Sequence, residues 1–129
     1  MSSNTKYLRG PFDWARNLEY SQAVKTQGLV FVSGQYGAGS EGEVVSDDFR
    51  EQTIATFENL KKVLQASGSD FSKVVQMKCY ILDGADYPIF KEVRRSFMPE
   101  GVSPASVVMC VPAFAFKGMK IEVEAVAEV

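Results

Sequence analysis

The sequence contains no histidine, and this absence decides which chemistry its other reactive side chains can perform. Catalysis by Ser-His-Asp or Cys-His groups is excluded, as is every metal site that needs imidazole. The two cysteines, Cys79 and Cys110, form no Cys-x-x-Cys pattern, so we expect small core residues rather than nucleophiles, disulfide partners or zinc ligands. Acid–base chemistry must therefore come from Asp, Glu, Lys, Tyr, Cys or bound water, and no metal or other cofactor is predicted.

Two glutamates near the C-terminus are the first candidates for such chemistry. Glu122 and Glu124 alternate with Ile121, Val123 and Ala125, which places both carboxylates on the face of a strand opposite its apolar side. On a solvent-facing surface they would be solubilising charges, whereas on a face that meets another subunit at least one must be paired, hydrated or protonated. A partly buried carboxylate with a raised pKa is a candidate base near neutral pH.

A basic group lies in the segment before these glutamates. Lys91, Arg94 and Arg95 share one side of a predicted helix through their i, i+3 and i+4 spacing. A solvated basic face and a carboxylate-binding site both account for this pattern, and the solvated face is the simpler of the two.

Aromatic and cationic side chains alternate over residues 6–16, near the start of the chain. They would form a clamp over a ligand, or an arm that packs its rings on the protein surface, and we favour the arm. The side chains concerned are Lys6, Tyr7, Arg9, Phe12, Trp14 and Arg16.

The segment from Gly37 to Gly42 matches the Gly-x-Gly-x-x-Gly pattern that follows a strand in nucleotide-binding proteins. No predicted helix opens at its third glycine, and the acidic residues Glu43, Asp47 and Asp48 follow, which would repel phosphate. We therefore predict a hairpin loop there and no nucleotide.

The overall charge favours neither a nucleic acid nor a membrane as partner. Lys and Arg total 14 and Asp and Glu total 16, giving a formal net charge of −2 without a basic stripe. No run approaches the ~18 apolar residues of a membrane helix, and the N-terminus lacks the apolar centre of a signal peptide. We expect a cytoplasmic protein of one domain over residues 1–129, with an N-terminal arm at 1–17 and a core at 18–129.

Hydrophobic periodicity predicts the elements that must position these residues. Residues 20–35 indicate a β-hairpin that turns at 26–28. A helix is expected from about Asp48 to Ser67, with a capping box formed by Asp48 and Glu51. Its predicted buried stripe consists of Ile54, Phe57, Leu60 and Leu64.

The second half predicts a strand, a helix and two more strands. The strand at 73–82 should bury Val75, Met77, Cys79 and Ile81. A helix follows from about residue 86 to 98, then a buried strand at 105–111 and a final strand at 120–127. The order β-β-α-β-α-β-β places two helices on one sheet face and leaves the other bare. Apolar residues on both faces of the strands favour oligomerisation.

Several short motifs together resemble the RidA/YjgF/UK114 family. They occur in that family's order from Tyr20 to the C-terminus. The resemblance implies a chorismate-mutase-like α/β (α+β) fold and a homotrimer around a central barrel, with a small-molecule cleft at each subunit boundary. The motifs are 20–23 (YSQA), 33–35 (SGQ), 52–53 (QT), 59–60 (NL), 99–101 (PEG), 104–105 (PA) and 121–127 (IEVEAVA).

The resemblance also assigns roles to positions in this sequence. In the family, the cleft uses a tyrosine, a serine, an asparagine, a carboxylate-binding arginine and a glutamate that positions water. Here Tyr20, Ser33 and Glu122 are kept as catalytic residues, whereas Lys91 replaces the asparagine and Ser106 replaces the arginine. A neutral serine cannot grip a carboxylate as a guanidinium does, so Lys91, Arg94 or Arg16 must supply the cation if a carboxylate binds. The predicted substrate-binding residues are Lys91, Ser106, Val108, Gly34 and Arg94, with Phe114 or Phe116 available to a larger ligand.

Family members hydrolyse enamine or imine intermediates to a 2-oxo acid and ammonia. The resemblance therefore implies a hydrolytic deaminase-like enzyme whose substrate differs from 2-aminoacrylate. The alternative is a non-catalytic trimer that binds a small metabolite in the same cleft. Ribonuclease or chaperone-like roles are least favoured, because the chain has neither histidine nor a basic stripe.

Overall fold

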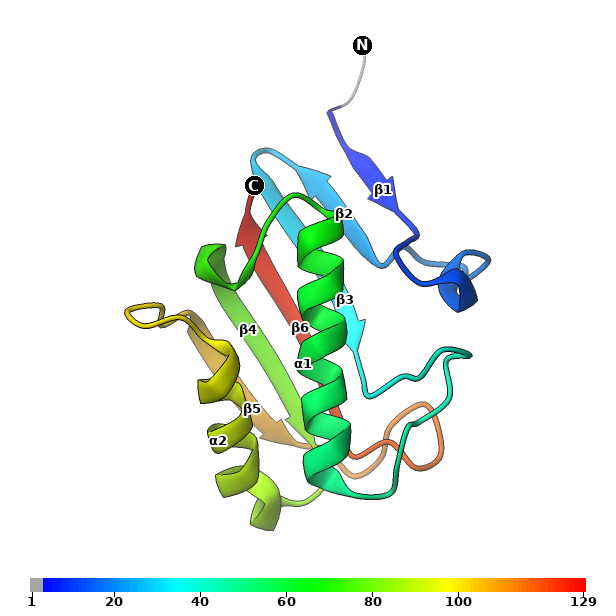
Figure 1. Ribbon diagram of the computed structural model, residues 1–129, viewed down its shortest axis with the longest axis vertical. Helices are drawn as coiled ribbons and strands as arrows, with labels where there is room; N and C mark the ends of the chain where they lie inside the picture. Colours follow the sequence, from blue (N-terminus) through cyan, green and yellow to red (C-terminus); the bar gives the residue numbers. More distant parts are fainter. Residues whose placement is uncertain (1–3) are drawn as a thin grey trace.

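The computed structural model describes residues 4–129, in which six strands form one sheet with two helices (Figure 1). The strand order is β1-β2-β3-β6-β4-β5, and all neighbours are antiparallel except the parallel pair β4 and β5. This mixed α+β architecture confirms the predicted fold class. The elements are β1 (Lys6–Leu8), β2 (Ala23–Thr26), β3 (Leu29–Gln35), α1 (Phe49–Ala66), β4 (Val74–Ile81), α2 (Tyr87–Phe97), β5 (Ala105–Cys110) and β6 (Ile121–Glu128).

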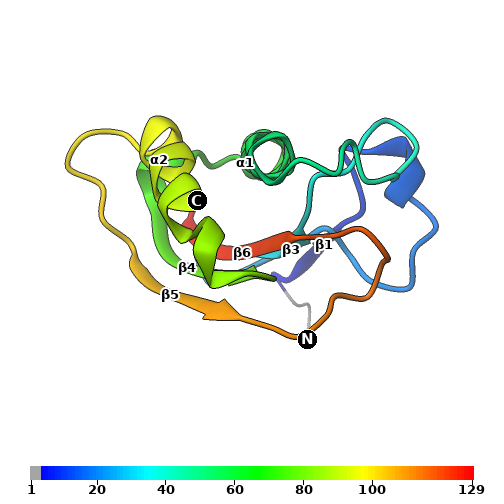
Figure 2. The same ribbon diagram turned by 90° about the horizontal axis from the view of Figure 1, so that it is seen from below.

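Both helices cover the same face of the sheet, as Figure 2 shows, and the opposite face is bare. On β6, Ile121, Val123, Ala125 and Ala127 are buried beneath the helices, while the intervening glutamates lie on the open face. The predicted alternation of this strand is therefore confirmed. It fixes the side of the sheet on which the Glu122 side chain lies.

Local signals account well for the turns and the first helix. The β2–β3 hairpin turns through Gln27 and Gly28, whose φ angles of 54° and 78° are those of a two-residue turn with both φ positive. Helix α1 begins after Asp48, whose side chain accepts a hydrogen bond from the Glu51 N–H at 2.9 Å. The reciprocal half of the capping box passes through Ser46, whose hydroxyl bonds both the Asp48 N–H and the Glu51 carboxylate.

Two predicted core positions are wrong, each for a local reason. Ile54 is 37% exposed, because the buried side of α1 passes through its neighbour Thr53 and through Thr56. Val75 is exposed because an irregularity in the β4–β6 pairing lies between Val74 and Gln76, which turns Val74 inward instead. The remaining members of both predicted stripes are buried.

Strand β5, predicted to be buried, is mostly exposed. It is an edge strand that pairs only with β4, and Val107 and Met109 are 42% and 47% exposed. The prediction that Cys110 is a core residue is wrong for the same reason, since its side chain is exposed at this edge. At the other edge, the predicted N-terminal arm contributes a strand that periodicity did not predict, because β1 has only three residues. Residues 1–3 of that arm lie outside the described part of the chain.

Two buried amides on α1, Gln52 and Asn59, tie the loop after β3 to the helix. Asn59 Nδ2 donates to the carbonyl oxygens of Tyr36 at 3.1 Å and Ala38 at 3.0 Å. Gln52 Nε2 donates to the carbonyl oxygens of Ser46 and Gly118, and its Oε1 accepts from the Lys120 N–H. From the helix-covered face, these side chains therefore hold the segments that leave β3 and enter β6, at the end of the sheet nearest to Glu122.

We expect Asn59→Leu to lower the free energy of unfolding by about 1–3 kcal/mol, because it removes the amide donor from the Ala38 carbonyl, whereas the Tyr36 carbonyl keeps its hydrogen bond from the Ala38 N–H. Urea denaturation at one fixed protein concentration measures the change. The matched control is Glu58→Gln on the exposed side of the same turn, which should stay within about 0.5 kcal/mol of the wild type. Equal stability of the two variants would contradict the role of Asn59.

Candidate active site

The Glu122 carboxylate occupies a recess on the open face of the sheet. Glu122 lies opposite Tyr80 on β4, and on its other side the β3–β6 register shifts between Val32 and Gln35. This irregularity places Gly34 directly against the glutamate, since a Cβ atom at position 34 would lie 2.6 Å from Glu122 Oε2. The absence of a side chain at position 34 therefore makes the room that the carboxylate fills.

The electrostatic setting of Glu122 favours a base. Burial raises the pKa of its carboxyl group, and the charge of Glu124 raises it further. Burial likewise raises the pKa of the Tyr20 phenol, with contributions from the carboxylates of Glu122 and Glu19. The site thus combines a carboxylate that is more basic than usual with a neutral phenol that can donate a hydrogen bond.

Glu124, two residues along the same strand, has a different environment. The Tyr80 hydroxyl donates to Glu124 Oε1 at 2.7 Å, and this bond is the main reason that the pKa of Tyr80 rises to about 12. Within residues 4–129, the Glu122 carboxylate accepts no corresponding hydrogen bond. The Glu124 carboxylate is therefore held by a hydrogen bond within its own chain, whereas the Glu122 carboxylate can accept hydrogen bonds from a ligand or water.

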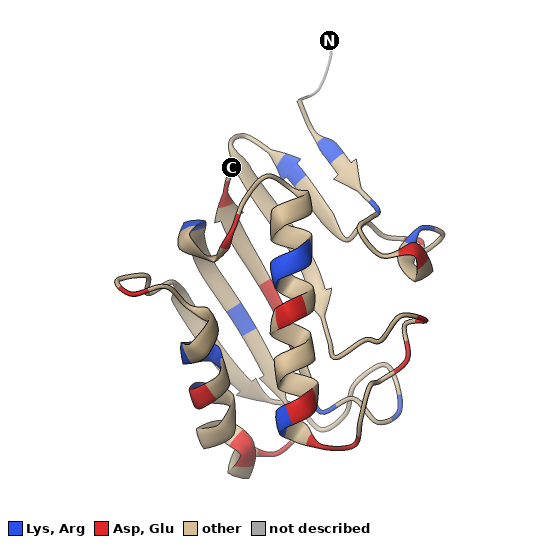
Figure 3. Cartoon of the chain, viewed as in Figure 1, with Lys and Arg blue, Asp and Glu red and all other residues tan. Residues whose placement is uncertain are grey.

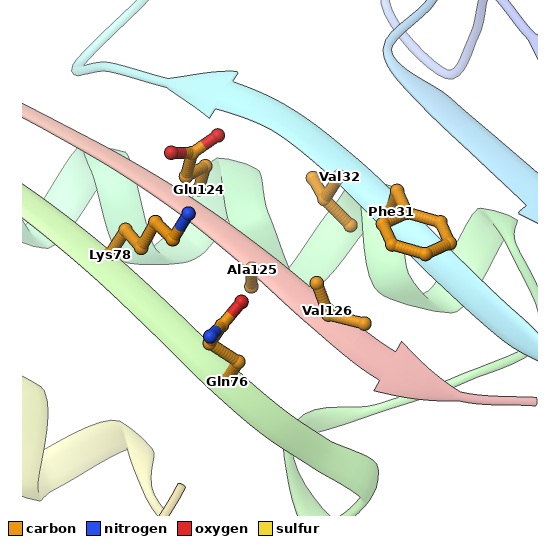
Figure 4. Close-up of a pocket in the computed structure, with 7 residues that line it drawn as sticks. All are labelled: Phe31, Val32, Gln76, Lys78, Glu124, Ala125 and Val126. Atoms are coloured by element: carbon orange, nitrogen blue, oxygen red, sulfur yellow. The ribbon is translucent and has the colours of Figure 1, made fainter. Parts of the chain in front are cut away.

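A shallow groove runs beside Glu124 on the open face (Figure 4). Lys78 and Glu124 occupy opposed register positions on β4 and β6, and the figure shows their side chains extending into the groove. Its volume is about 200 Å³. The lining residues are Phe31, Val32, Gln76, Lys78, Glu124, Ala125 and Val126.

Ser33 and its neighbouring glutamines brace the β3 end of the site. The Ser33 hydroxyl donates to the Ser21 carbonyl at 2.6 Å, which leaves its oxygen free to accept. Gln35 Nε2 donates to Gln22 Oε1 at 2.9 Å, and both glutamine side chains are buried. The predicted Ser33 is thus oriented by the backbone of Ser21, which directly follows Tyr20 and precedes β2.

Tyr36, which the sequence analysis did not name, lies in an aromatic cluster next to this site, and its hydroxyl donates to the Gly42 carbonyl oxygen. Its ring makes edge contacts with Trp14 and Phe116, at centroid distances of 6.0 and 5.4 Å. Burial raises its pKa, as do Tyr20, Glu43 and Glu122 in that order. Its place directly after the Ser33-Gly34-Gln35 motif was the available signal. The structure also shows that Trp14 packs within the protein, in agreement with the favoured interpretation of the aromatic arm.

The glycine-rich loop confirms the interpretation as a loop rather than a phosphate site. The Glu43 carboxylate lies under Gly39, where a Cβ atom would meet its Oε1 at 2.5 Å. The Glu41 N–H donates to the same oxygen at 3.0 Å. The protein's own carboxylate therefore fills the space that an anion would need.

A second group of predicted site residues lies on the helix side of the sheet. Arg94 Nη1 on α2 donates to Ser106 Oγ on β5 at 2.9 Å. Val108 is paired with the buried Cys79, and Lys91 extends over the Tyr87 ring at 5.5 Å. Burial raises the pKa of Cys79 to about 12 despite the opposing effect of Arg94, so this thiol stays protonated, as expected for a core cysteine.

One chain therefore assembles the predicted site as two separate groups. Glu122 and Gly34 lie on the open face with Tyr20 beside them, while Arg94, Ser106 and Val108 lie on the face that carries the helices. Of the other predicted cations, Arg16 pairs with Asp13 at 3.0 Å in the N-terminal segment. The eight predicted residues do not surround a common cavity within a single chain.

Residues 4–129 contain no cluster of three or more His, Cys, Asp or Glu side chains arranged to hold a metal ion. None of their helices has the length and apolar character needed to cross a membrane. Figure 3 shows acidic and basic residues interspersed over helices, strands and loops.

A six-stranded mixed sheet with two helices on one face and a half-buried carboxylate on the other defines a small α+β protein with a recessed acidic site. The family model described as Endoribonuclease L-PSP matches residues 15–129. The chain belongs to this family, which is the RidA/YjgF family named by the sequence resemblance.

Characterised relatives and solved structures agree with this assignment. The chain is 37% identical over 110 residues to the mitochondrial protein mmf2 of Schizosaccharomyces pombe, covering 84% of this chain and 86% of that protein. It is 35% identical to the 2-iminobutanoate/2-iminopropanoate deaminase of Rattus norvegicus, covering 84% and 78%. A crystal structure described as a putative endoribonuclease L-PSP from Entamoeba histolytica superposes with a TM-score of 0.89 at 29% identity, covering 98% and 100%. Because mmf2 is mitochondrial, the expected cytoplasmic location stays a prediction.

Proposed function

We propose that this protein is a hydrolytic deaminase that acts on an imine or enamine in a cleft between two copies of the chain. The observation that carries the proposal is the Glu122 carboxylate, half-buried against Gly34, without a hydrogen-bond donor among the described residues, and beside the neutral Tyr20 phenol. A relative named 2-iminobutanoate/2-iminopropanoate deaminase supports the reaction class.

The chemistry follows from these groups. Glu122 accepts a proton from a water molecule as the water oxygen bonds to the imine carbon, and passes this proton to the nitrogen, which receives the C=N electrons. In the resulting carbinolamine the hydroxyl proton moves through the same carboxylate to the nitrogen, and the C–N bond breaks as the C=O bond forms. This releases ammonia and a 2-oxo acid and returns Glu122 to its ionised form. Tyr20 donates a hydrogen bond to the developing charge, and Ser33 accepts one from the hydroxyl or amine.

A homotrimer supplies what one chain lacks. The bare sheet face and the apolar residues of β5 favour association of copies, and the separation of the site into two groups favours a cleft to which neighbouring subunits contribute different residues. In this assembly one subunit contributes Glu122, Tyr20, Ser33 and Gly34. The next contributes Lys91, Arg94, Ser106 and Val108.

The alternative is a trimer that binds a metabolite without converting it. Ser106 favours this alternative. In the family, an arginine at that position binds the substrate carboxylate, and a neutral serine cannot replace that interaction. Release of ammonia from imines generated in situ by an amino-acid oxidase separates the two functions. Binding of the matching 2-oxo acid without ammonia release would support the binding protein.

Subunit mixing tests the shared cleft directly. Measured well below the KM, Glu122→Gln and Arg94→Gln should each lose most of the activity alone, yet trimers reassembled from equal amounts should recover about a quarter of wild-type activity, because a random closed ring restores that share of native clefts. Ammonia release before and after mixing measures this, and light scattering checks that the mixed species are trimers. No recovery in verified mixed trimers would place the whole site in one chain, and a monomeric wild type would overturn the assembly.

A further inference from the structure

Arg94 is a fixed guanidinium without a carboxylate partner. Its Nη1 donates to Ser106 Oγ at 2.9 Å, and its Cζ lies 4.8 Å from the centroid of the Phe90 ring, so the head group is held from two sides. The ion pairs among residues 4–129 are Arg16 with Asp13 and Arg50 with Glu92, and neither involves Arg94. A guanidinium carries five N–H donors in a planar fork, which leaves donors available for an anion.

Two hollows adjoin this guanidinium, and Arg94 and Ser106 line both. The larger has a volume of about 580 Å³, and apart from these two its walls are mainly apolar, formed by Ile81, Tyr87, Val108 and Cys110 with Gly84. The smaller, of about 270 Å³, includes Lys91 and Arg95 and has no acidic side chain in its lining. A negatively charged group is therefore favoured at Arg94, with an apolar surface directly beside it.

We propose that Arg94 binds the substrate carboxylate, that Ser106 positions its guanidinium, and that the larger hollow receives the apolar side chain of a 2-imino acid bigger than the alanine-derived one. This inference rests on the proposed function, since it assigns the substrate class of the same cleft. The short side chain of Ser106 leaves space along β5. The Arg94 guanidinium, which extends from α2, binds the carboxylate from the helix-covered face. Arg94 is then the specificity-determining residue and Ser106 a positioning residue.

The test measures binding of stable product analogues, so its result is independent of turnover. Isothermal titration compares 4-methyl-2-oxopentanoate with its uncharged amide on the wild type, Arg94→Gln and the control Lys62→Gln. Arg94→Gln should weaken binding of the acid by about 10- to 100-fold and of the amide by less than about threefold, because only the acid makes charge-assisted hydrogen bonds. Lys62→Gln, which removes an exposed positive charge from α1 and lines neither hollow, should alter either affinity by less than about threefold.

Ser106 and the apolar hollow have their own readouts. Ser106→Ala should weaken acid binding by about 3- to 10-fold, and Ser106→Thr, which keeps the hydroxyl, should restore it. The wild type should bind 4-methyl-2-oxopentanoate about 10-fold more tightly than pyruvate, because the extra apolar groups are buried. If Arg94→Gln does not fold, Arg94→Lys retains the charge without the fork and should show an intermediate loss for the acid alone.

The outcomes separate this inference from the proposed function. Equal losses for the acid and the amide on Arg94→Gln, or tighter binding of pyruvate than of 4-methyl-2-oxopentanoate, would overturn the inference even if ammonia is released. The expected binding pattern without ammonia release would leave Arg94 as the carboxylate-binding residue and refute the deaminase.

Discussion

Glu122→Gln is expected to lower turnover of an imine by about 10²–10⁴-fold while ligand binding and assembly stay close to those of the wild type. The amide keeps the shape that fills the recess above Gly34 but cannot accept a proton from water. Ammonia release measured under saturating substrate, together with titration of the product 2-oxo acid, gives the turnover and binding terms separately. Nearly full turnover in this variant would make Glu122 a structural carboxylate.

The pH profile adds a second readout for the same residue. Because burial and Glu124 raise the pKa of Glu122, kcat/KM should fall as the pH drops through that raised pKa, above the ~4.3 of free glutamate. Glu124→Gln removes one of the two causes and should therefore move this acid limb to lower pH, with turnover at neutral pH changed by less than about 10-fold. An acid limb that is unchanged in Glu124→Gln would contradict the coupling of the two carboxylates.

Gly34→Ala is expected to lower turnover by about 10²-fold, because the added methyl group displaces the base. Its carbon would lie 2.6 Å from Glu122 Oε2, well inside contact distance, and a shift of about 1 Å in a reacting group can cost this much. Gly34 does not have a positive φ angle, so alanine introduces no backbone strain. Thermal unfolding should show a folded variant with an inactive site.

The shorter Glu122→Asp side chain provides the control for this steric argument. Glu122→Asp alone withdraws the carboxylate from Gly34 and should reduce turnover. Adding Gly34→Ala to Glu122→Asp should then cost much less than it does in the wild type, because the clash has been removed. Fully additive losses in the double variant would show that Gly34 affects catalysis through something other than contact with Glu122.

Short-range signals in the sequence were sufficient for most of the fold. Asp48 and Gly68 bound α1 because caps act within one helical turn, and alternation placed Glu122 opposite its apolar neighbours because side-chain direction in a strand is local. Val75 failed because the irregularity beside it depends on pairing with β6, which lies far along the chain. The prediction for Ile54 was wrong because the buried side of α1 includes the threonines Thr53 and Thr56, which a search for apolar spacing does not detect.

The site was harder to predict than the fold, since its members meet only in three dimensions. The family resemblance nominated Glu122, Tyr20 and Ser33, but the contact of Gly34 with Glu122 arises from a register shift between two strands. Periodicity placed Arg94 on the polar side of α2 and could not show that it reaches Ser106. Sheet order, which short-range patterns do not encode, separates the two groups further, because β4 lies between β6 and β5.

The unpaired edge of β5 makes a single chain prone to aggregation. An unpaired strand edge with apolar side chains such as Val107 and Met109 is a template for aggregation, whereas the edge at β1 is short and carries Lys6. A single chain is therefore open to non-native strand pairing at one end of its sheet and protected at the other. If copies of the chain associate as proposed above, association would compete with aggregation in a dilute or freshly synthesised pool, and the balance between them would limit the yield of native protein.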